Sequence, residues 1–391
     1  MKIILAISLF IVFYTFVGYG IFLYIIIRIK RVFKGTKALP AENPDTLPSC
    51  TLVIAAYNEE YFIEQKIKNS LQLNYPEGKL KLLFVTDGSS DKTPDIIARY
   101  PQIQLLHKPE RAGKIAAVHR AMEYVDTDAV VFTDANTFLN KDALIKICRH
   151  YSDATVGAVA GEKRVHIDEN ADASAAGEGF YWKYESALKK WDSELYSVVG
   201  AAGELFSVRR SLYQPVEPDT VLDDFMISML IAAKGYRIVY EPEAYATETA
   251  SENVSEELKR KVRIAAGGIQ SILRLKKLFN PFPYPVLSFQ YVSHRVLRWT
   301  ITPFLLILSF ILTVVLALKP NETDMQLLLL AQVLFYILAL LGLLMEKRQL
   351  RIKVLFIPYY FCVMNYAVLA GIIRYFSTKQ SAVWEKVQRK Q

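Results

Sequence analysis

Two stretches of sequence decide the fold, TLVIAAYNEE at residues 51–60 and KLLFVTDGSSDKT at residues 81–93. Each begins as a short apolar run of the kind found in strands buried on both faces, and each ends in polar, turn-forming residues. A helical pattern follows each run, at residues 59–71 and 91–99. This order predicts parallel strands joined by helices.

The same alternation continues outward from these stretches. It predicts strands at residues 103–106, 129–133 and 156–160, and helices at residues 114–124 and 141–151. We therefore expect an α/β domain with a mostly parallel sheet at residues 49–250. Ligands of such sheets bind at the carboxyl ends of the strands, which selects the loops at residues 57–60, 87–92, 109–114 and 134–137.

The four loops carry side chains that suit a nucleotide and a divalent ion. Tyr57 offers a ring to a base, and Asp87 offers a carboxylate to a base N–H. Gly113 and Lys114 follow the third strand, where the lysine suits a phosphate. Asp134 follows the fourth strand, and hard divalent cations take carboxylate oxygens and bridge phosphates.

Four stretches of the 391-residue chain contain no charged residue, at residues 3–27, 301–318, 325–345 and 354–373. Each is long enough for a bilayer span of ~17–25 residues. All charges therefore lie in the rest of the chain, which excludes a wholly soluble protein, a disordered one and a pure bundle transporter. We expect a multi-pass membrane protein that carries a soluble domain.

The net charge of +8 is concentrated beside the apolar stretches. Residues 28–37 carry +5, residues 256–277 +5, residues 346–353 +3 and residues 374–391 +4, which leaves −9 elsewhere. The positive-inside rule and attraction to anionic lipid account for this pattern, whereas a nucleic-acid binder carries its basic residues on the globular domain. We expect no nucleic-acid partner, and an uncleaved anchor that leaves residue 28 onward in the cytoplasm.

These patterns divide the chain into six segments. They are an anchor at residues 1–27, a basic, proline-containing linker at 28–48, the soluble domain at 49–250, amphipathic interfacial helices at 251–299, a membrane module at 300–376 and a basic tail at 377–391. Three further crossings would place the tail outside, although its charge is typical of the cytoplasmic side. Pro358 and Asn365 interrupt the last apolar stretch, so a re-entrant or interfacial course is the alternative to a crossing.

Five motifs in this order resemble those of the membrane-bound family 2 glycosyltransferases, the branch that includes cellulose, hyaluronan and poly-N-acetylglucosamine synthases. They are Tyr57-Asn58-Glu59, Asp87-Gly88-Ser89, Gly113-Lys114, Asp134-Ala135-Asn136 and TVLDDF at residues 220–225. The resemblance extends from Leu52 to about Arg389. It implies a GT-A fold, which is a Rossmann-like nucleotide-diphospho-sugar transferase domain, together with transmembrane helices.

The resemblance also implies residue roles. The nucleotide-sugar would be bound by Ala56, Tyr57, Glu59, Asp87, Gly113, Lys114 and Asp134. Asp134 and Asn136 would hold Mg²⁺ or Mn²⁺, with the asparagine in place of the second carboxylate of the family's D-x-D motif. Asp224 would be the general base on the acceptor hydroxyl, and repulsion from Asp223 would raise its pKa.

The acceptor side is implied by a second group of residues. Arg260 and Arg263 match the basic positions of the (Q/R)-x-x-R-W motif, where they would bind the diphosphate or the acceptor. Ile264 stands where long-chain synthases have tryptophan, which leaves open whether one sugar or many are added. Gly203 and Glu204 resemble the acceptor-side loop.

Three of the tryptophans have an interpretation from sequence. Trp384 and Arg389 resemble a tail motif that reaches back toward the substrate site, whereas Trp182 and Trp191 are interpreted as packing residues.

The sequence thus predicts an inverting membrane glycosyltransferase that moves a sugar from a nucleotide donor, expected to be UDP-linked, to a growing polysaccharide or a lipid-linked acceptor. Two alternatives stay open: a polyprenyl-phosphate glycosyltransferase that makes a lipid-linked monosaccharide, and a non-catalytic membrane assembly subunit of the same fold. Expected partners are the nucleotide-sugar, the acceptor, the lipid bilayer and, optionally, an accessory membrane subunit. The expected location is the bacterial inner membrane, with the catalytic domain in the cytoplasm.

Overall fold

The computed structural model describes residues 1–35, 38–166, 173–249, 254–347 and 353–377. Its soluble part is built on an eight-stranded sheet with the order β3-β2-β1-β4-β7-β6-β8-β5. The strands are β1 (Cys50–Ala56), β2 (Leu80–Asp87), β3 (Gln104–Lys108), β4 (Ala129–Asp134), β5 (Phe138–Leu139), β6 (Val156–His166), β7 (Leu205–Arg209) and β8 (Arg237–Thr249). The predicted parallel pairing is present from β3 to β4, and β7 then runs antiparallel to both β4 and β6.

The sheet is buried on both faces because its strands alternate side chains between two helical layers. Leu52 and Ile54 of β1 pack on one face, and Val53 and Ala55 pack on the other. The first face is covered by α3 (Ile63–Leu71), α4 (Thr93–Ala98) and α6 (Ala143–Cys148). The second face is covered by α5 (Lys114–Glu123) and α8 (Asp223–Ala232).

The first helix begins later than the sequence predicts. The pattern places its start at residue 59, but α3 begins at Ile63. Asn58 adopts a positive φ of 53°, and the Glu59 N–H donates to Thr93 Oγ1 at 2.8 Å. The N–H groups of Asn58, Glu59 and Glu60 therefore bind side chains of the segment after β2, and the Glu59 carbonyl accepts from the Ile63 N–H, where α3 begins.

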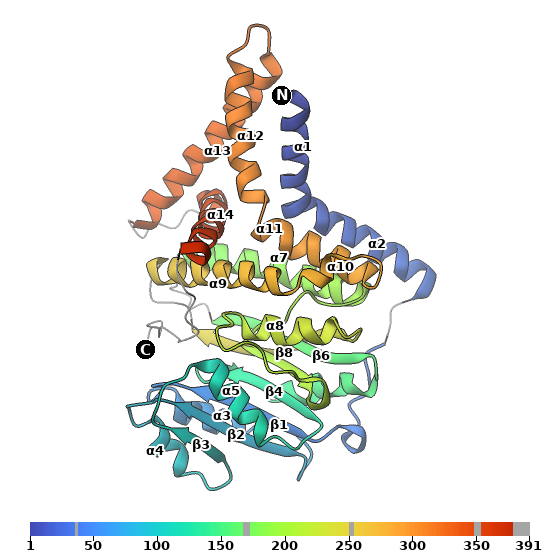
Figure 1. Ribbon diagram of the computed structural model, residues 1–391, viewed down its shortest axis with the longest axis vertical. Helices are drawn as coiled ribbons and strands as arrows, with labels where there is room; N and C mark the ends of the chain where they lie inside the picture. Colours follow the sequence, from blue (N-terminus) through green and yellow to red (C-terminus); the bar gives the residue numbers. More distant parts are fainter. Residues whose placement is uncertain (36–37, 167–172, 250–253, 348–352, 378–391) are drawn as a thin grey trace.

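The remaining helices lie on the side of the sheet that α8 covers. They are α1 (Lys2–Phe13), α2 (Tyr19–Lys34), α7 (Ala173–Leu195), α9 (Val254–Arg274), α10 (Pro285–Tyr291), α11 (Leu297–Trp299), α12 (Thr302–Ala317), α13 (Thr323–Lys347) and α14 (Lys353–Ser377). Figure 1 shows α1, α12 and α13 projecting away from the sheet, with α2, α7, α9 and α10 as a layer between them and the sheet.

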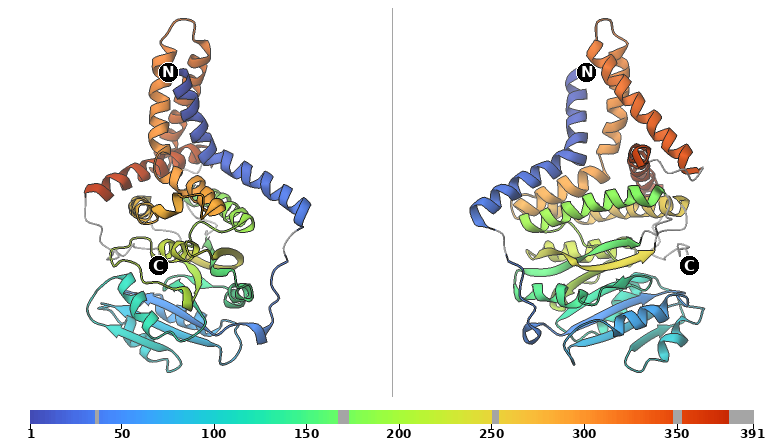
Figure 2. Two further views of the ribbon diagram at one scale, coloured as in Figure 1. Left: turned by 45° about the vertical axis from the view of Figure 1, so that its right-hand side comes forward. Right: turned by 180° about the vertical axis from the view of Figure 1, so that it is seen from behind.

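The amino-terminal apolar stretch is not one straight helix. It bends at the π-helical turn η1 (Tyr14–Gly18), after which α2 turns along α7 (Figure 2). Tyr19 and Leu23 of α2 are buried against Leu188 of α7. The second half of the stretch is therefore packed on the layer next to the soluble domain.

Three described helices are long and apolar enough to cross a membrane: Lys2–Lys34, Thr323–Glu346 and Val354–Ser377. The bent pair Pro285–Trp299 and Thr302–Ala317, at 59°, would add a fourth. Figures 1 and 2 show α14 running across the direction of α12 and α13, beside α9. A Cβ atom on Gly371 would lie 2.5 Å from Ala265 Cβ, so α14 and α9 approach closely there.

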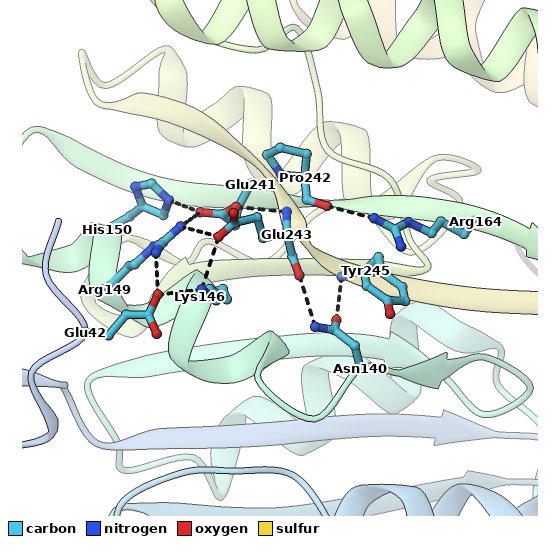
Figure 3. Close-up of polar contacts among 10 residues, drawn as sticks. All are labelled: Glu42, Asn140, Lys146, Arg149, His150, Arg164, Glu241, Pro242, Glu243 and Tyr245. Atoms are coloured by element: carbon cyan, nitrogen blue, oxygen red, sulfur yellow. Dashed lines mark hydrogen bonds and ion pairs between the residues drawn. The ribbon is translucent and has the colours of Figure 1, made fainter. Parts of the chain in front are cut away.

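The linker that follows α2 is fixed to the soluble domain by a charged cluster (Figure 3). Glu42 Oε1 accepts from Lys146 Nζ and from Arg149 Nη1, each at 2.6 Å. Arg149 also donates to Glu241 Oε2 at 2.7 Å, and that oxygen lies 2.7 Å from His150 Nε2. This cluster joins the linker, α6 and β8 on the side of the domain.

Candidate functional site

The loops after β1 and β2 bind each other through side-chain hydrogen bonds. The Asn58 N–H donates to Ser89 Oγ at 3.1 Å, and the Ser90 N–H donates to Asn58 Oδ1 at 2.8 Å. Ala56 is buried at the end of β1, and Glu59 is buried at the start of the turn. The guanidinium of Arg111 lies 3.8 Å from the centre of the Tyr57 ring. The Arg111 guanidinium thus stacks on the Tyr57 ring, the ring that was predicted to face a nucleotide base.

Asp87 holds the loop that leads into α5. Its Oδ2 accepts the N–H groups of Ala112 and Gly113, at 2.9 and 2.6 Å. Its Oδ1 is buried and has no hydrogen-bond partner among the described residues, with Arg120 Nη1 4.0 Å away. One carboxylate oxygen is thus structural, and the other is positioned for a further donor.

Lys114 lies between carboxylates of two elements, β4 and α8. Its Nζ lies 2.8 Å from Asp134 Oδ1, at the end of β4, and 3.7 Å from Asp223 Oδ2, at the start of α8. Burial alone would lower the pKa of Lys114, but Asp134, Asp223 and Asp224 raise it overall. The lysine is therefore a fixed positive charge between β4 and α8.

Asp224 has a raised pKa. Burial, with repulsion from Asp223, raises the pKa of Asp224 to about 7 against the attraction of Lys114. A Cβ atom on Gly203 would lie 3.3 Å from Asp224 Oδ2 and 3.5 Å from Lys114 Nζ, so the glycine leaves room beside both groups. A carboxyl group with a pKa near the working pH can accept a proton during turnover.

Asp134 and Asn136 fit a divalent cation by their chemistry. The buried Asn136 Oδ1 has no hydrogen-bond partner among the described residues, and it is two positions from the Asp134 carboxylate. The described part of the chain contains no group of three His, Cys, Asp or Glu side chains that could hold a metal. One carboxylate and one amide oxygen suffice where substrate phosphates and water supply the other ligands, as is usual for Mg²⁺.

Asp134, Asp223 and Asp224 border a cavity of about 300 Å³, and α9 forms part of its wall. Arg260 Nη2 lies 3.3 Å from Glu204 Oε1, and Lys163 Nζ lies 2.7 Å from the same atom. Burial would raise the pKa of Glu204, but Lys163 and Arg260 lower it overall despite repulsion from Glu248. Glu204 therefore remains ionised and holds Arg260 at the cavity wall.

Comparison with known proteins identifies the soluble domain. Residues 51–216 match the family model described as glycosyl transferase family 2. The chain carries a family 2 glycosyltransferase domain. This confirms the resemblance seen in the motifs.

The relatives of this glycosyltransferase domain include named enzymes. The chain is 29% identical over 245 residues to the poly-beta-1,6-N-acetyl-D-glucosamine synthase of Staphylococcus aureus, with 60% of this chain and 58% of that protein covered. It is 27% identical over 256 residues to the probable glycosyltransferase YdaM of Bacillus subtilis, with 61% and 59% covered. The chain thus spans under two thirds of the length of these curated relatives.

A solved structure shares the fold over nearly the whole chain. It is a mannosyltransferase from Pyrobaculum calidifontis, PcManGT, with a TM-score of 0.71 and 24% identity, and 96% of this chain and 99% of that one are covered. This likeness confirms the predicted GT-A fold.

The structure brings the predicted residues together in two groups. Lys114, Asp134, Gly203, Glu204, Asp223, Asp224, Arg260 and Arg263 line the cavity. Ala56, Tyr57, Glu59, Asp87 and Gly113 lie in the strand-end loops, outside the described cavity wall. Gly113 and Lys114 join the two groups, because they are consecutive residues at the start of α5.

Sequence reasoning missed part of the cavity wall. Trp182 and Lys189 of α7 line it, as do Arg295 and Trp299 near α11 and Met364 of α14. Trp191, by contrast, packs edge-on against Tyr24 of α2, with the ring centres 5.6 Å apart.

Two further predictions concern the same surface. Ile264, which replaces the motif tryptophan, lines the cavity with 36% of its surface exposed. Trp384 and Arg389 of the tail lie outside the described residues.

Proposed function

We propose that the protein is an inverting glycosyltransferase that moves a sugar from a nucleotide donor, most simply a UDP-sugar, to an acceptor hydroxyl. The observation that carries the proposal is the buried Asp224, whose pKa is raised to about 7 beside the Lys114–Asp134 pair. A base of this kind is needed on the acceptor side of an inverting transfer. The curated synthase relative supports a glycan-type acceptor.

In the proposed mechanism each group of residues has one task. Tyr57 and Asp87 bind the base of the nucleotide, while Lys114 and Arg263 stabilise the phosphates. Asp134 and Asn136 would hold Mg²⁺ or Mn²⁺, whose charge stabilises the diphosphate leaving group. The solved mannosyltransferase, titled as a complex with GDP-Man and Mn²⁺, agrees with this kind of donor and ion. Asp224 takes the proton of the acceptor hydroxyl as that oxygen attacks the sugar.

We also propose that the domain is cytoplasmic and that three segments cross the membrane: α1 together with η1, the apolar residues 301–318 that contain α12, and α13. Their common direction away from the sheet supports this, as does the position of α14 across them beside α9 (Figures 1 and 2). An interfacial α14 would keep the basic tail on the side of the catalytic domain, as the positive-inside rule requires. Accessibility labelling of single cysteines introduced at Glu322 and Arg374 tests this, because the two sites should then lie on opposite sides.

The activity is tested on full-length protein in detergent with single UDP-sugars and Mg²⁺ or Mn²⁺. Nucleotide release and sugar transfer are expected with at least one donor, and Asp224→Asn should remove transfer. Asp126→Asn is the matched control, because Asp126 is exposed and pairs only with Lys81 among the described residues. Absence of transfer with every donor would contradict the proposal, as would an Asp224→Asn protein that behaves like wild type.

A further inference from the structure

A second cavity, of about 320 Å³, lies among the helices. It adjoins the cavity that Asp224 lines (the reactive cavity). The two share Trp299, Met364 and Val368 in their walls, so they meet at α11 and α14. The volume is within the ~300–1,000 Å³ typical of small-molecule sites. The wall includes Val17 of η1 and Ile357 of α14, which belong to two of the candidate membrane spans.

The wall of the second cavity offers apolar surface to an occupant. The Tyr184 hydroxyl donates to the Phe16 carbonyl at 2.8 Å, and the Asn365 amide donates to the Phe361 carbonyl at 2.9 Å. The Tyr184 hydroxyl and the Asn365 amide N–H are thus satisfied within the wall itself, and the other polar side chains of the wall are those of Tyr360 and Arg298. A glycan chain would need hydrogen-bond partners for its hydroxyls, whereas a hydrocarbon chain needs none.

Three cationic side chains lie near the junction of the two cavities. Lys261 Nζ lies 5.2 Å from the centre of the Tyr360 ring, which lines the second cavity. Arg295 lies 5.5 Å from the centre of the Trp299 ring, and Arg298 lines the second cavity. Among the described residues, Glu257 pairs with Lys261, and Glu185 pairs with both arginines.

One side of the second cavity reaches the outer surface of the helices. Val17 and Ile357 are 46% and 53% exposed, although both line the cavity. A hydrocarbon chain can therefore enter sideways from the bilayer, without passing through the soluble domain.

From this arrangement we infer that the acceptor is a sugar carried on a polyprenyl phosphate. Its hydrocarbon chain lies in the second cavity, its phosphate lies at the junction near Lys261, and its sugar hydroxyl points to Asp224. This inference rests on the proposed function, and it names the class of acceptor that the proposed enzyme would use. In the transfer the acceptor oxygen bonds to the anomeric carbon of the donor sugar, and the bond from that carbon to the nucleoside diphosphate breaks. The hydroxyl proton passes to Asp224, and the nucleoside diphosphate leaves with the bonding electron pair.

The test uses full-length protein in detergent and a polyprenyl phosphate that carries a photoreactive diazirine in its chain. Labelling should fall on the peptides that contain Val17 and Ile357, and unlabelled polyprenyl phosphate should displace it. Val17→Trp should lower labelling about tenfold, since expelling two methylenes is enough for such a loss. Ile357→Trp is a second cavity-filling variant. Val315→Trp is the matched control, because Val315 is 42% exposed on α12 and does not line the cavity.

The outcomes separate this inference from the proposed function, because labelling requires no turnover. Labelling spread over the outer faces of α12 and α13 would overturn it, as would equal displacement by phosphatidylglycerol or wild-type labelling of both filling variants. Nucleotide release and transfer without cavity labelling would overturn the acceptor class alone. Labelling without nucleotide release from any donor would overturn the proposed function, and the acceptor role with it.

Discussion

At the scale of single residues, Asp224 gives the reaction its expected pH dependence. Its pKa is raised to about 7, so the carboxyl is protonated and unable to act as a base in more acidic solution. The rate of transfer should fall about tenfold per pH unit below pH 7. Asp224→Asn should lower kcat by ~10²–10⁴ and leave the KM for the donor nearly unchanged. Initial rates over a pH series check both expectations.

The same pKa predicts an opposite effect on stability. Because the folded protein holds a proton on Asp224 that the unfolded chain has lost, stability should decrease as pH rises from about 4 to about 7. Asp224→Asn removes this penalty and should therefore raise Tm at pH 8 while it removes activity. A variant with a lower Tm at pH 8 than wild type would contradict the burial of an ionisable Asp224.

Asn136 sets the charge of the proposed metal site. Asn136→Asp adds a second carboxylate next to Asp134, and charge count tunes the affinity for divalent ions. The Mn²⁺ concentration for half-maximal activity should fall about tenfold. Asn43→Asp is the control, because it adds the same charge at an exposed position and keeps the oxygen that caps Asp45. Equal Mn²⁺ requirements in wild type and Asn136→Asp would place the ion elsewhere.

At the scale of elements, the position of α8 depends on Gly200. Gly200 has a φ of 84°, and a Cβ atom there would lie 2.1 Å from Phe225 in the first turn of α8. Gly200→Ala should cost ~1–2 kcal/mol for the left-handed backbone and ~1–3 kcal/mol more for overpacking. Gly235→Ala is matched in φ, at 92°, with no atom within 4 Å.

Thermal unfolding in detergent measures the difference between these two variants. Both should have a lower Tm than wild type, and Gly200→Ala the lower of the two. Only Gly200→Ala should also lose activity, because Asp224 precedes the displaced Phe225. Equal Tm values for the two variants would show that α8 shifts away from the added Cβ atom without a further loss of stability.

The positions of the site residues at the strand ends were predictable because each of their motifs is contiguous and follows a strand. Asp87 and Asp134 end β2 and β4, and the rule for the carboxyl ends of parallel strands places them on one edge. The start of α3 was missed because the backbone N–H groups of Asn58 and Glu59 donate to the side chains of Ser89 and Thr93, which lie 31 and 34 residues further along the chain. A helical pattern in the sequence contains no information on such a partner.

At the scale of the whole molecule, the cavity wall shows where prediction from sequence ends. Trp182, Trp299 and Met364 come from α7, α11 and α14, and they meet only because the helical layer folds over the sheet. Trp182 has the sequence surroundings of a packing residue, and its place in the wall depends on helices that follow much later in the chain. The bend at η1 is equally non-local, since α2 turns where Tyr19 and Leu23 find α7.

The contact of α7 with α2 and α10 depends on Asp192 of α7. This fully buried carboxylate accepts the Tyr19 hydroxyl of α2 at 2.5 Å and the Gln290 amide of α10 at 3.0 Å, and it lies 2.6 Å from His294 Nδ1. Asp192→Ala leaves these buried groups without their acceptor and should cost ~3–5 kcal/mol.

The expected result is a large fall in Tm together with loss of activity, although Asp192 is no part of the reactive cavity. Asp192→Asn keeps an acceptor oxygen and should fall between the alanine variant and wild type. Asp126→Ala is the control for a lost ion pair, because its bridge to Lys81 is exposed and solvent screens such pairs strongly. If Asp192→Ala and Asp126→Ala unfold at the same temperature, α7 is held against α2 and α10 by apolar packing alone.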